Sequence, residues 1–135
     1  MPQRSETFPL DPSKPLIPVD VLLEGPKGQQ LIRMALDSGA TYTIAPQWIL
    51  HAIGYHPFTT GQTIEFIAAG SVERKPLVTV DAVSAFGVRV AKLPVVCHDL
   101  PAQSPVKGLL GLNFLRHFNV HLNFLSGRIE LHSKP

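Results

Sequence analysis

Apolar residues recur at every second position, or in short runs, along most of the chain, and turn-forming residues separate these stretches. Alternation of this kind is typical of strands with one buried face. It predicts strands at residues 16–23, 29–36, 44–45, 63–68, 72–83, 88–97, 120–124 and 128–131. Pro18 and Pro94 stand within two of these stretches, and proline there indicates an edge position or an interruption of the strand.

Two stretches carry helix signals instead. Residues 46–54 begin with a proline, which suits the first turn of a helix, and end with a glycine, which suits its C-terminal stop. A second short helix is predicted over residues 112–118, after the segment Gly-Leu-Leu-Gly at 108–111. The turn at residues 69–71 joins two of the predicted strands into a hairpin. Thirteen prolines and ten glycines leave no room for long helices, so an all-β domain is expected.

The 135 residues fit one domain, in which residues 1–15 form an extended, proline-rich arm with little structure of its own and residues 16–135 form the folded part. Hydrophobic residues make up 44% of the chain and charged residues 16%, which is typical of a globular protein. A net charge of +2 with scattered signs argues against a nucleic-acid partner. The longest apolar runs are too short for a membrane segment.

The first six residues have no apolar core of a signal peptide, and Cys97 is the only cysteine. A single cysteine excludes an internal disulfide and fits a reducing compartment, so a cytoplasmic location is expected. In a predicted strand, Cys97 is better explained as a buried thiol than as a nucleophile, which would need an activated thiolate.

The most informative stretch is Asp37-Ser38-Gly39-Ala40-Thr41, which follows the apolar run at residues 31–36. A carboxylate at the end of a buried strand is costly to ionise unless N–H groups and hydroxyls point toward it. Gly39 permits a tight turn that aims N–H groups back at the carboxylate, and Ser38 and Thr41 offer hydroxyls. Asp37 is therefore a candidate catalytic acid; the alternative is an ordinary strand that ends in an Asp-Gly turn.

The six histidines raise the alternative of a metal site. His117 and His121 are four residues apart, but the chain between them is predicted to change from helix to strand. Cys97-His98-Asp99 is dense, but neighbouring residues of a strand point to opposite faces. No metal and no cofactor is therefore expected, and the histidines are interpreted as structural or surface residues.

Three motifs, by their order and spacing along the chain, make it resemble the retroviral-type, or retropepsin-like, aspartic proteases. These are Leu-Asp-Ser-Gly-Ala-Thr at 36–41, the hairpin centred on Ala69-Gly70, and Leu-Leu-Gly-Leu-Asn-Phe-Leu at 109–115. The resemblance covers residues 16–131. It implies a closed-barrel-like, all-β aspartic protease fold with a flap hairpin and one or two short helices. Residues 1–15 do not resemble the short terminal strand that viral members use in their dimers.

The resemblance implies an aspartic endopeptidase, and this chemistry needs two carboxylates. The chain has one Asp-Ser-Gly, so a homodimer is expected in which Asp37 meets its own copy across a two-fold axis. Ser38 would hold the two turns together, Gly39 would aim its backbone at the carboxylate, and Thr41 would bond its outer oxygen.

The substrate would be an extended peptide or protein segment lying between the Asp37 pair and the flaps. The resemblance implies that the flap and substrate-binding residues are Phe66, Ile67, Ala68, Ala69, Gly70 and Leu109. For Phe66, Ile67 and Leu109 the alternative is a place in the core. The alternative function is a non-catalytic dimeric module that binds peptides or partners on the same fold.

Overall fold

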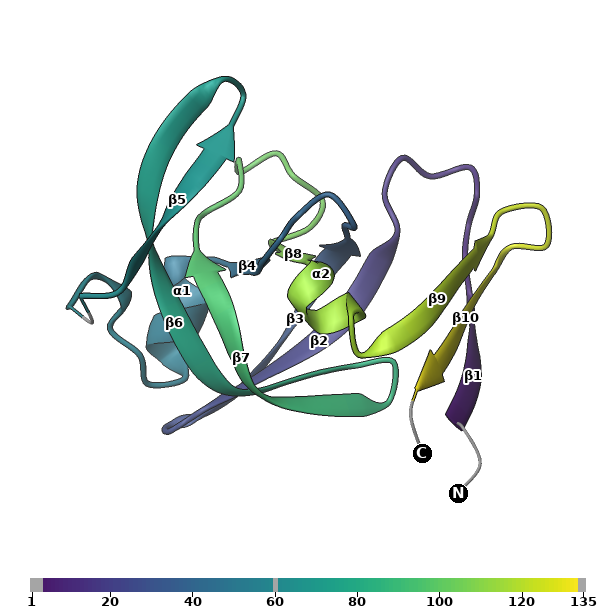
Figure 1. Ribbon diagram of the computed structural model, residues 1–135, viewed down its shortest axis with the longest axis horizontal. Coiled ribbons are helices and arrows are strands. Elements are labelled where there is room, and N and C mark those ends of the chain that lie inside the picture. The colour runs from purple at the N-terminus through teal and green to yellow at the C-terminus, as the bar shows by residue number, and fades with distance from the viewer. Residues whose placement is uncertain (1–3, 60, 134–135) are drawn as a thin grey trace.

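The computed structural model describes residues 4–59 and 61–133, and the strands dominate it (Figure 1). The elements in these ranges are β1 (Arg4–Pro9), β2 (Pro18–Gly25), β3 (Gly28–Leu36), β4 (Thr43–Ala45), α1 (Gln47–Ala52), the 3₁₀ turn η1 (Pro57–Thr59), β5 (Thr63–Ala68), β6 (Ser71–Ala85), β7 (Val88–Cys97), β8 (Gly108–Leu110), α2 (Leu112–Leu115), β9 (Phe118–Asn123) and β10 (Arg128–Ser133). The predicted all-β class is confirmed, and so are both helices, although α2 is shorter than expected. None of the helices in the described ranges is long and apolar enough to cross a membrane.

Six strands close into a barrel. Their order is β2-β3-β8-β4-β7-β6, and β6 returns to pair with β2 through Leu22 opposite Ser84 and Glu24 opposite Ala82. Closure leaves the barrel without a free edge. The barrel therefore provides a rigid frame for the two strands that carry the sequence motifs, β3 and β8.

The core lies inside this barrel and under α1. Alternate residues of β2 and β3 point inward, as the pattern of the sequence predicts, and Val21 and Met34 are fully buried. Phe114 of α2 and Ile49 and Leu50 of α1 are also fully buried. Burial of each such side chain stabilises the fold by about 1.5–3 kcal/mol relative to its exposure.

Strand β5 lies outside the barrel, and β6 is its one strand partner among the described residues. The first part of β6 pairs with β5, from Ser71 opposite Ala68 to Pro76 opposite Thr63, and the rest of β6 belongs to the barrel. Residues 63–76, called the flap hairpin below, therefore project from the barrel, at the upper left of Figure 1. The hairpin turns at Ala69 and Gly70, which both have positive φ, as a two-residue turn between twisted strands requires.

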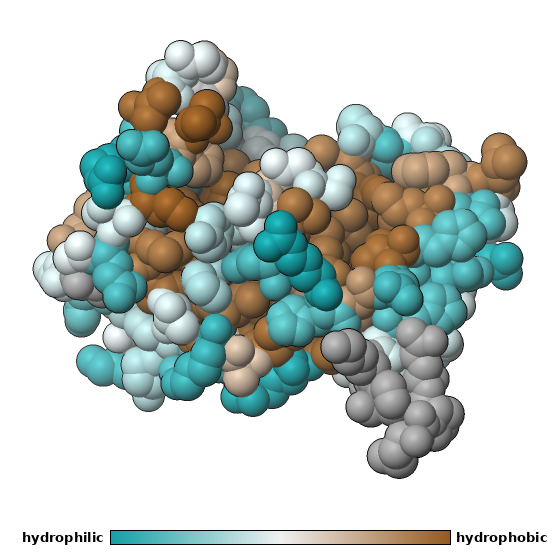
Figure 2. Space-filling model, in the orientation of Figure 1, coloured by the Kyte–Doolittle hydropathy of each residue, from teal (hydrophilic) through white to brown (hydrophobic). Residues whose placement is uncertain are grey.

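The flap hairpin exposes apolar side chains. Ile67 and Val72 face each other across its two strands and are 73% and 63% exposed. Figure 2 shows brown, hydrophobic side chains on this projection. The tip of the hairpin thus exposes apolar side chains that are not part of the core, and exposed apolar patches often mark interaction sites.

The N-terminal arm differs from the expectation. Residues 4–9 are not unstructured: they form β1, which pairs with β10 along its whole length, from Arg4 opposite Ser133 to Pro9 opposite Arg128. The sheet β1-β10-β9 is separate from the barrel. Leu10 is buried with Ile129 and Leu131, and these contacts, which are distant in sequence, explain why a polar, proline-rich stretch is ordered.

Two further details concern the second helix and Pro94. The second helix ends at Leu115 rather than at residue 118, because Phe118 pairs with Ser133 as the first residue of β9. Strand β7 runs through Pro94 without interruption. The pairing of β7 with β4 begins one residue later, at Val95, so Pro94 has no strand on that side.

Candidate active site

The motifs at residues 36–41 and 109–115 lie side by side because β3 and β8 are parallel neighbours. Leu36 pairs with Leu110, and β4 adds an antiparallel pairing of Ile44 with Leu109 on the other side of β8. Asp37 follows β3 directly, and its N–H donates to the Leu110 carbonyl at 3.0 Å. The acid is therefore fixed by the second motif, which lies far from it in sequence.

Two glycines of the second motif make this close pairing possible. A Cβ atom on Gly108 would lie 2.3 Å from the Ile44 carbonyl oxygen, and one on Gly111 would lie 2.6 Å from the Tyr42 carbonyl oxygen. Backbone atoms cannot yield to such contacts as flexible side chains do. Glycine at these positions is therefore required by close approach of the backbone, not by an unusual φ, which is −95° at Gly111.

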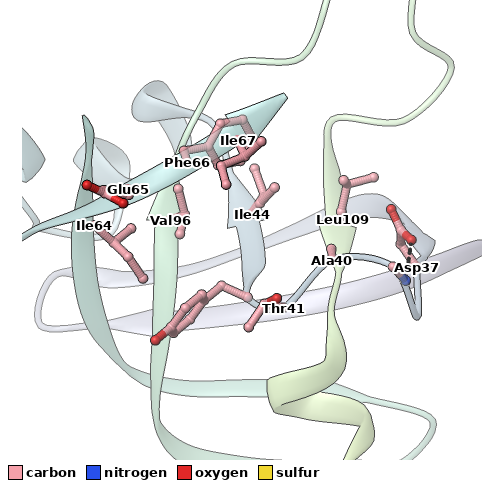
Figure 3. Close-up of a pocket in the computed structure, with 12 residues that line it drawn as sticks. Asp37, Ala40, Thr41, Ile44, Ile64, Glu65, Phe66, Ile67, Val96 and Leu109 are labelled. Atoms are coloured by element: carbon pink, nitrogen blue, oxygen red, sulfur yellow. Dashed lines mark hydrogen bonds between the residues drawn. The ribbon is translucent and has the colours of Figure 1, made fainter. Parts of the chain in front are cut away.

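Asp37 is a half-buried residue, and its carboxylate accepts a hydrogen bond from the Gly39 N–H at 2.8 Å, drawn as a dashed line in Figure 3. The Ala40 N–H closes the turn by donating to the Asp37 carbonyl at 3.2 Å. Gly39 thus has the geometry that the sequence predicts. Ser38 is exposed, and the predicted bond from the Thr41 hydroxyl to Asp37 is not among the hydrogen bonds within residues 4–59 and 61–133.

A partly buried hydrogen-bond network behind the turn involves residues to which the sequence assigned no role. The Asn113 Oδ1 atom accepts hydrogen bonds from both the N–H and the hydroxyl of Thr43, each at 2.9 Å. The Asn113 Nδ2 donates to the Pro94 carbonyl at 2.6 Å, and the Thr43 hydroxyl accepts from the Gly111 N–H at 3.1 Å. The network joins β4, β7 and α2. Together with the Asp37 turn it forms the Asp37 cradle (residues 36–43 and 108–113).

A pocket of about 500 Å³ opens between the Asp37 cradle and the flap hairpin (Figure 3). Its lining residues are Asp37, Gly39, Ala40, Thr41, Tyr42, Ile44, Ile64, Glu65, Phe66, Ile67, Val96 and Leu109. The structure therefore brings together most of the predicted site residues. The other predicted residues lie next to this lining: Ser38 is in the Asp37 turn, Ala68 ends β5 opposite Ser71, and Ala69 and Gly70 form the hairpin turn.

Phe66, Ile67 and Leu109 lie in the pocket wall and not in the core, which was the alternative. Phe66 and Leu109 are half-buried, Ile67 is exposed, and all three line the pocket. Sequence reasoning did not assign the other six lining residues to the site: Ala40, Tyr42, Ile44, Ile64, Glu65 and Val96. The signal that could have found Ile44 and Val96 is the parallel pairing of β4 with β7, in which they are opposite each other.

One histidine lies directly behind the pocket wall. The His98 ring packs on the Phe66 ring, with centroids 4.8 Å apart, so it connects the end of β7 to the flap hairpin. Burial, followed by the positive charge of Lys75, holds the pKa of His98 below its ordinary value. Burial and the charge of Lys75 therefore favour the neutral ring.

The other chemical candidates do not form sites. Cys97 is buried, and burial raises the pKa of its thiol to about 11, which leaves no thiolate at neutral pH. Within residues 4–59 and 61–133, no three His, Cys, Asp or Glu side chains are grouped as metal ligands would be. His117 follows α2 while His121 lies in β9, so these two do not share a helix face.

Comparison with known proteins points to one family. No curated protein matches the chain. Among solved structures, a retropepsin-like aspartic protease from Rickettsia conorii has the same fold, with a TM-score of 0.69 over 98% of this chain and 96% of that one, at 12% sequence identity. Residues 25–117 match the family described as "gag-polyprotein putative aspartyl protease". This match spans all three motifs, at residues 36–41, at the flap hairpin and at residues 109–115. The chain therefore belongs to the retropepsin-like aspartyl protease family.

Proposed function

We propose that the protein is an aspartic endopeptidase whose active site forms from the Asp37 residues of two identical chains. The observation that carries the proposal is the position of Asp37. Its carboxylate accepts a backbone N–H from Gly39 and lies at one end of a pocket that the flap hairpin covers. An aspartate held by a backbone hydrogen bond at the wall of a pocket is a typical functional-site arrangement.

Hydrolysis of an amide by carboxylates needs two of them. An ionised carboxylate takes a proton from the attacking water, and a protonated one hydrogen-bonds the carbonyl of the scissile bond. Two carboxyl groups about 3 Å apart cannot both ionise cheaply, so they share one proton. The chain supplies one such acid, because Asp11, Asp20, Asp81 and Asp99 lack the Ser-Gly that follows Asp37. A two-fold axis through a homodimer supplies the second.

The shape of the pocket favours an extended peptide as substrate. Its walls come from β4, β7, β8 and the flap hairpin, and they are mainly apolar, as at Ile44, Val96 and Leu109. Strand β5 has one free edge, because it pairs only with β6. An extended peptide adds main-chain hydrogen bonds to such an edge while its side chains enter the pocket.

The test is peptide cleavage by the purified protein and by Asp37→Asn. The substitution keeps the shape and the hydrogen bond from Gly39 but removes the proton that the pair shares. We expect the rate to fall by about 10³-fold or more while circular dichroism stays unchanged. Cleavage by Asp37→Asn at the wild-type rate would show that Asp37 is not the catalyst. An intact wild-type dimer that binds peptides but cleaves none would indicate the non-catalytic module instead.

Two further measurements test the pairing. Sedimentation at micromolar concentration should show a dimer, and full activity from a monomer would refute the two-chain site. The pH dependence of kcat/KM should be bell-shaped on the acidic side, because activity requires one proton on the pair and is lost when both carboxyls are protonated or both ionised. EDTA should have no effect. A profile that climbs steadily into alkaline pH, or one that EDTA abolishes, would indicate a metal-bound hydroxide.

A further inference from the structure

The charged residues that line the pocket are acidic. Of its twelve lining residues, Asp37 and Glu65 are acidic, and none is lysine, arginine or histidine. This contrasts with the chain as a whole, whose net charge is +2. The acidic lining is therefore a local property of the pocket and does not follow from composition.

Glu65 has no part in the proposed chemistry of Asp37. It lies in the middle of β5, and Figure 3 shows its carboxylate at the end of the pocket opposite Asp37. Apolar side chains, among them Ile44 and Val96, line the space between the two acids. The pocket thus has an apolar wall between Asp37 at one end and the exposed Glu65 carboxylate at the other.

The partner that Glu65 has within the chain is weakly held. The Arg74 Nη1 atom lies 3.9 Å from the Glu65 Oε1 atom, and both side chains are about two-thirds exposed, at 64% and 68%. The same guanidinium donates through Nε to the Thr63 hydroxyl at 3.1 Å. Exposed pairs of this length contribute little, so a ligand cation competes with Arg74 easily.

We propose that Glu65 determines specificity, and that it favours peptides carrying lysine or arginine at a position removed from the cleaved bond. The inference rests on the proposed peptidase function of Asp37 and adds a substrate class to it. Lysine and arginine have long aliphatic stems that pack on apolar surface while the charged head reaches a polar partner. The apolar wall fits the stem and Glu65 fits the head. A bound peptide excludes water from the pocket, which strengthens the charge pair.

The experiment compares peptides that differ only in one charge. A cleaved peptide is scanned with lysine at each position, and each lysine peptide is paired with its norleucine counterpart, which has the same stem without the ammonium group. We expect lysine to raise kcat/KM on the order of tenfold at one position on either side of the cleaved bond. Glu65→Gln should remove this preference, and Glu65→Lys should reverse it toward glutamate. Added salt should weaken it.

Glu73→Gln is the matched control, because it removes the same charge from the same hairpin at a residue outside the pocket lining. It should keep the preference for lysine. Equal kcat/KM for every lysine and norleucine pair, or a preference that survives Glu65→Gln, would overturn the inference.

Binding measurements separate this inference from the peptidase proposal. Anisotropy of the labelled peptides with Asp37→Asn reports the lysine preference without turnover. If Asp37→Asn binds lysine peptides more tightly than their norleucine counterparts and the wild type cleaves nothing, the inference about Glu65 is supported and the peptidase proposal fails. If the wild type cleaves all the peptides equally and Asp37→Asn binds them equally, the peptidase proposal is supported and the inference about Glu65 fails.

Discussion

The Asp37 cradle and the flap hairpin face the same pocket, but different forces hold them. In the cradle, backbones touch at Gly108 and Gly111, and Thr43 is fully buried with its hydrogen bonds made. The flap hairpin is two strands with an exposed apolar tip, held by its own ladder and by contacts such as that of Phe66 with His98. From this difference we expect the cradle to be rigid and the hairpin to move, because weakly held segments are the ones that open and close over a ligand.

The sharpest test of this contrast is one added methyl group at a glycine of each region. In Gly111→Ala the new Cβ meets the Tyr42 backbone at 2.6 Å, so the strands must separate, at a cost of about 3 kcal/mol or more in free energy of unfolding. In Gly70→Ala the Cβ meets nothing, and the φ of +81° costs about 1 kcal/mol, confined to the hairpin. Urea unfolding measures both. Equal losses would show that the cradle adapts as readily as the hairpin.

The second test removes a polar side chain from each region. Asn113→Ala leaves the Thr43 N–H and the Pro94 carbonyl without their partner, so we expect a loss of about 2–3 kcal/mol. Arg74→Ala removes an exposed ion pair and should change stability by less than about 0.5 kcal/mol. Urea titrations of the two variants make the comparison. An Asn113→Ala protein as stable as Arg74→Ala would mean that the network does not hold the cradle.

The third test concerns movement. Hydrogen exchange of the amides of residues 67–72 should slow about tenfold when a peptide-like inhibitor binds, because closing over a ligand orders a weakly held hairpin. The amides of residues 34–36 in β3, which lie within the closed barrel, should change little. Unchanged exchange at the hairpin with inhibitor shown to be bound would contradict its role as a flap.

The smallest expected effect is a pH dependence at His98. Because its pKa in the folded protein lies below the ordinary value, the stability that its neutral ring contributes is present above that ordinary value and is lost as pH falls toward the lowered one. Lys75 and Glu73 face it from β6, and Asp99 follows it in the chain. The pKa of Glu73 is itself lowered by Lys75, which keeps their pair at 3.0 Å ionised in this range.

The measurement for His98 is unfolding free energy against pH in the wild type and in His98→Gln. The wild type should lose more stability than His98→Gln as the solution becomes mildly acidic. Parallel curves would show that the contact with Phe66 does not depend on the charge of the ring.

The contrast between cradle and hairpin also explains what the sequence could predict. Local signals suffice for β5 and β7, whose predicted bounds match the structure, and for the Asp37 turn, where Gly39 makes the expected hydrogen bond. They fail for Asn113, because its partners Thr43 and Pro94 are distant in sequence and an asparagine in a helical stretch carries no signal of burial. They fail for residues 4–9, which become a strand only through β10.

Glu65 shows the same limit at the pocket. In the sequence it is one polar residue of an alternating strand, which usually indicates a solvated face. Its place opposite Asp37 depends on how far the flap hairpin leans over the barrel. No local pattern encodes that angle, because it follows from the pairing of β6 with β5 at one end and with β7 and β2 at the other.

The contacts of residues 108–113 with residues 36–43 have a consequence for the timing of folding. The bonds that join Thr43 to Asn113 connect residues 70 positions apart in the chain, and contacts at such separation form slowly, after the loop between them is closed. A nascent chain that ends before β8 has Asp37 but not the Leu110 carbonyl that fixes it. We therefore expect Asp37 to be fixed by Leu110 only when nearly the whole domain has been made, and an incomplete chain to carry the Asp37 turn without this hydrogen bond.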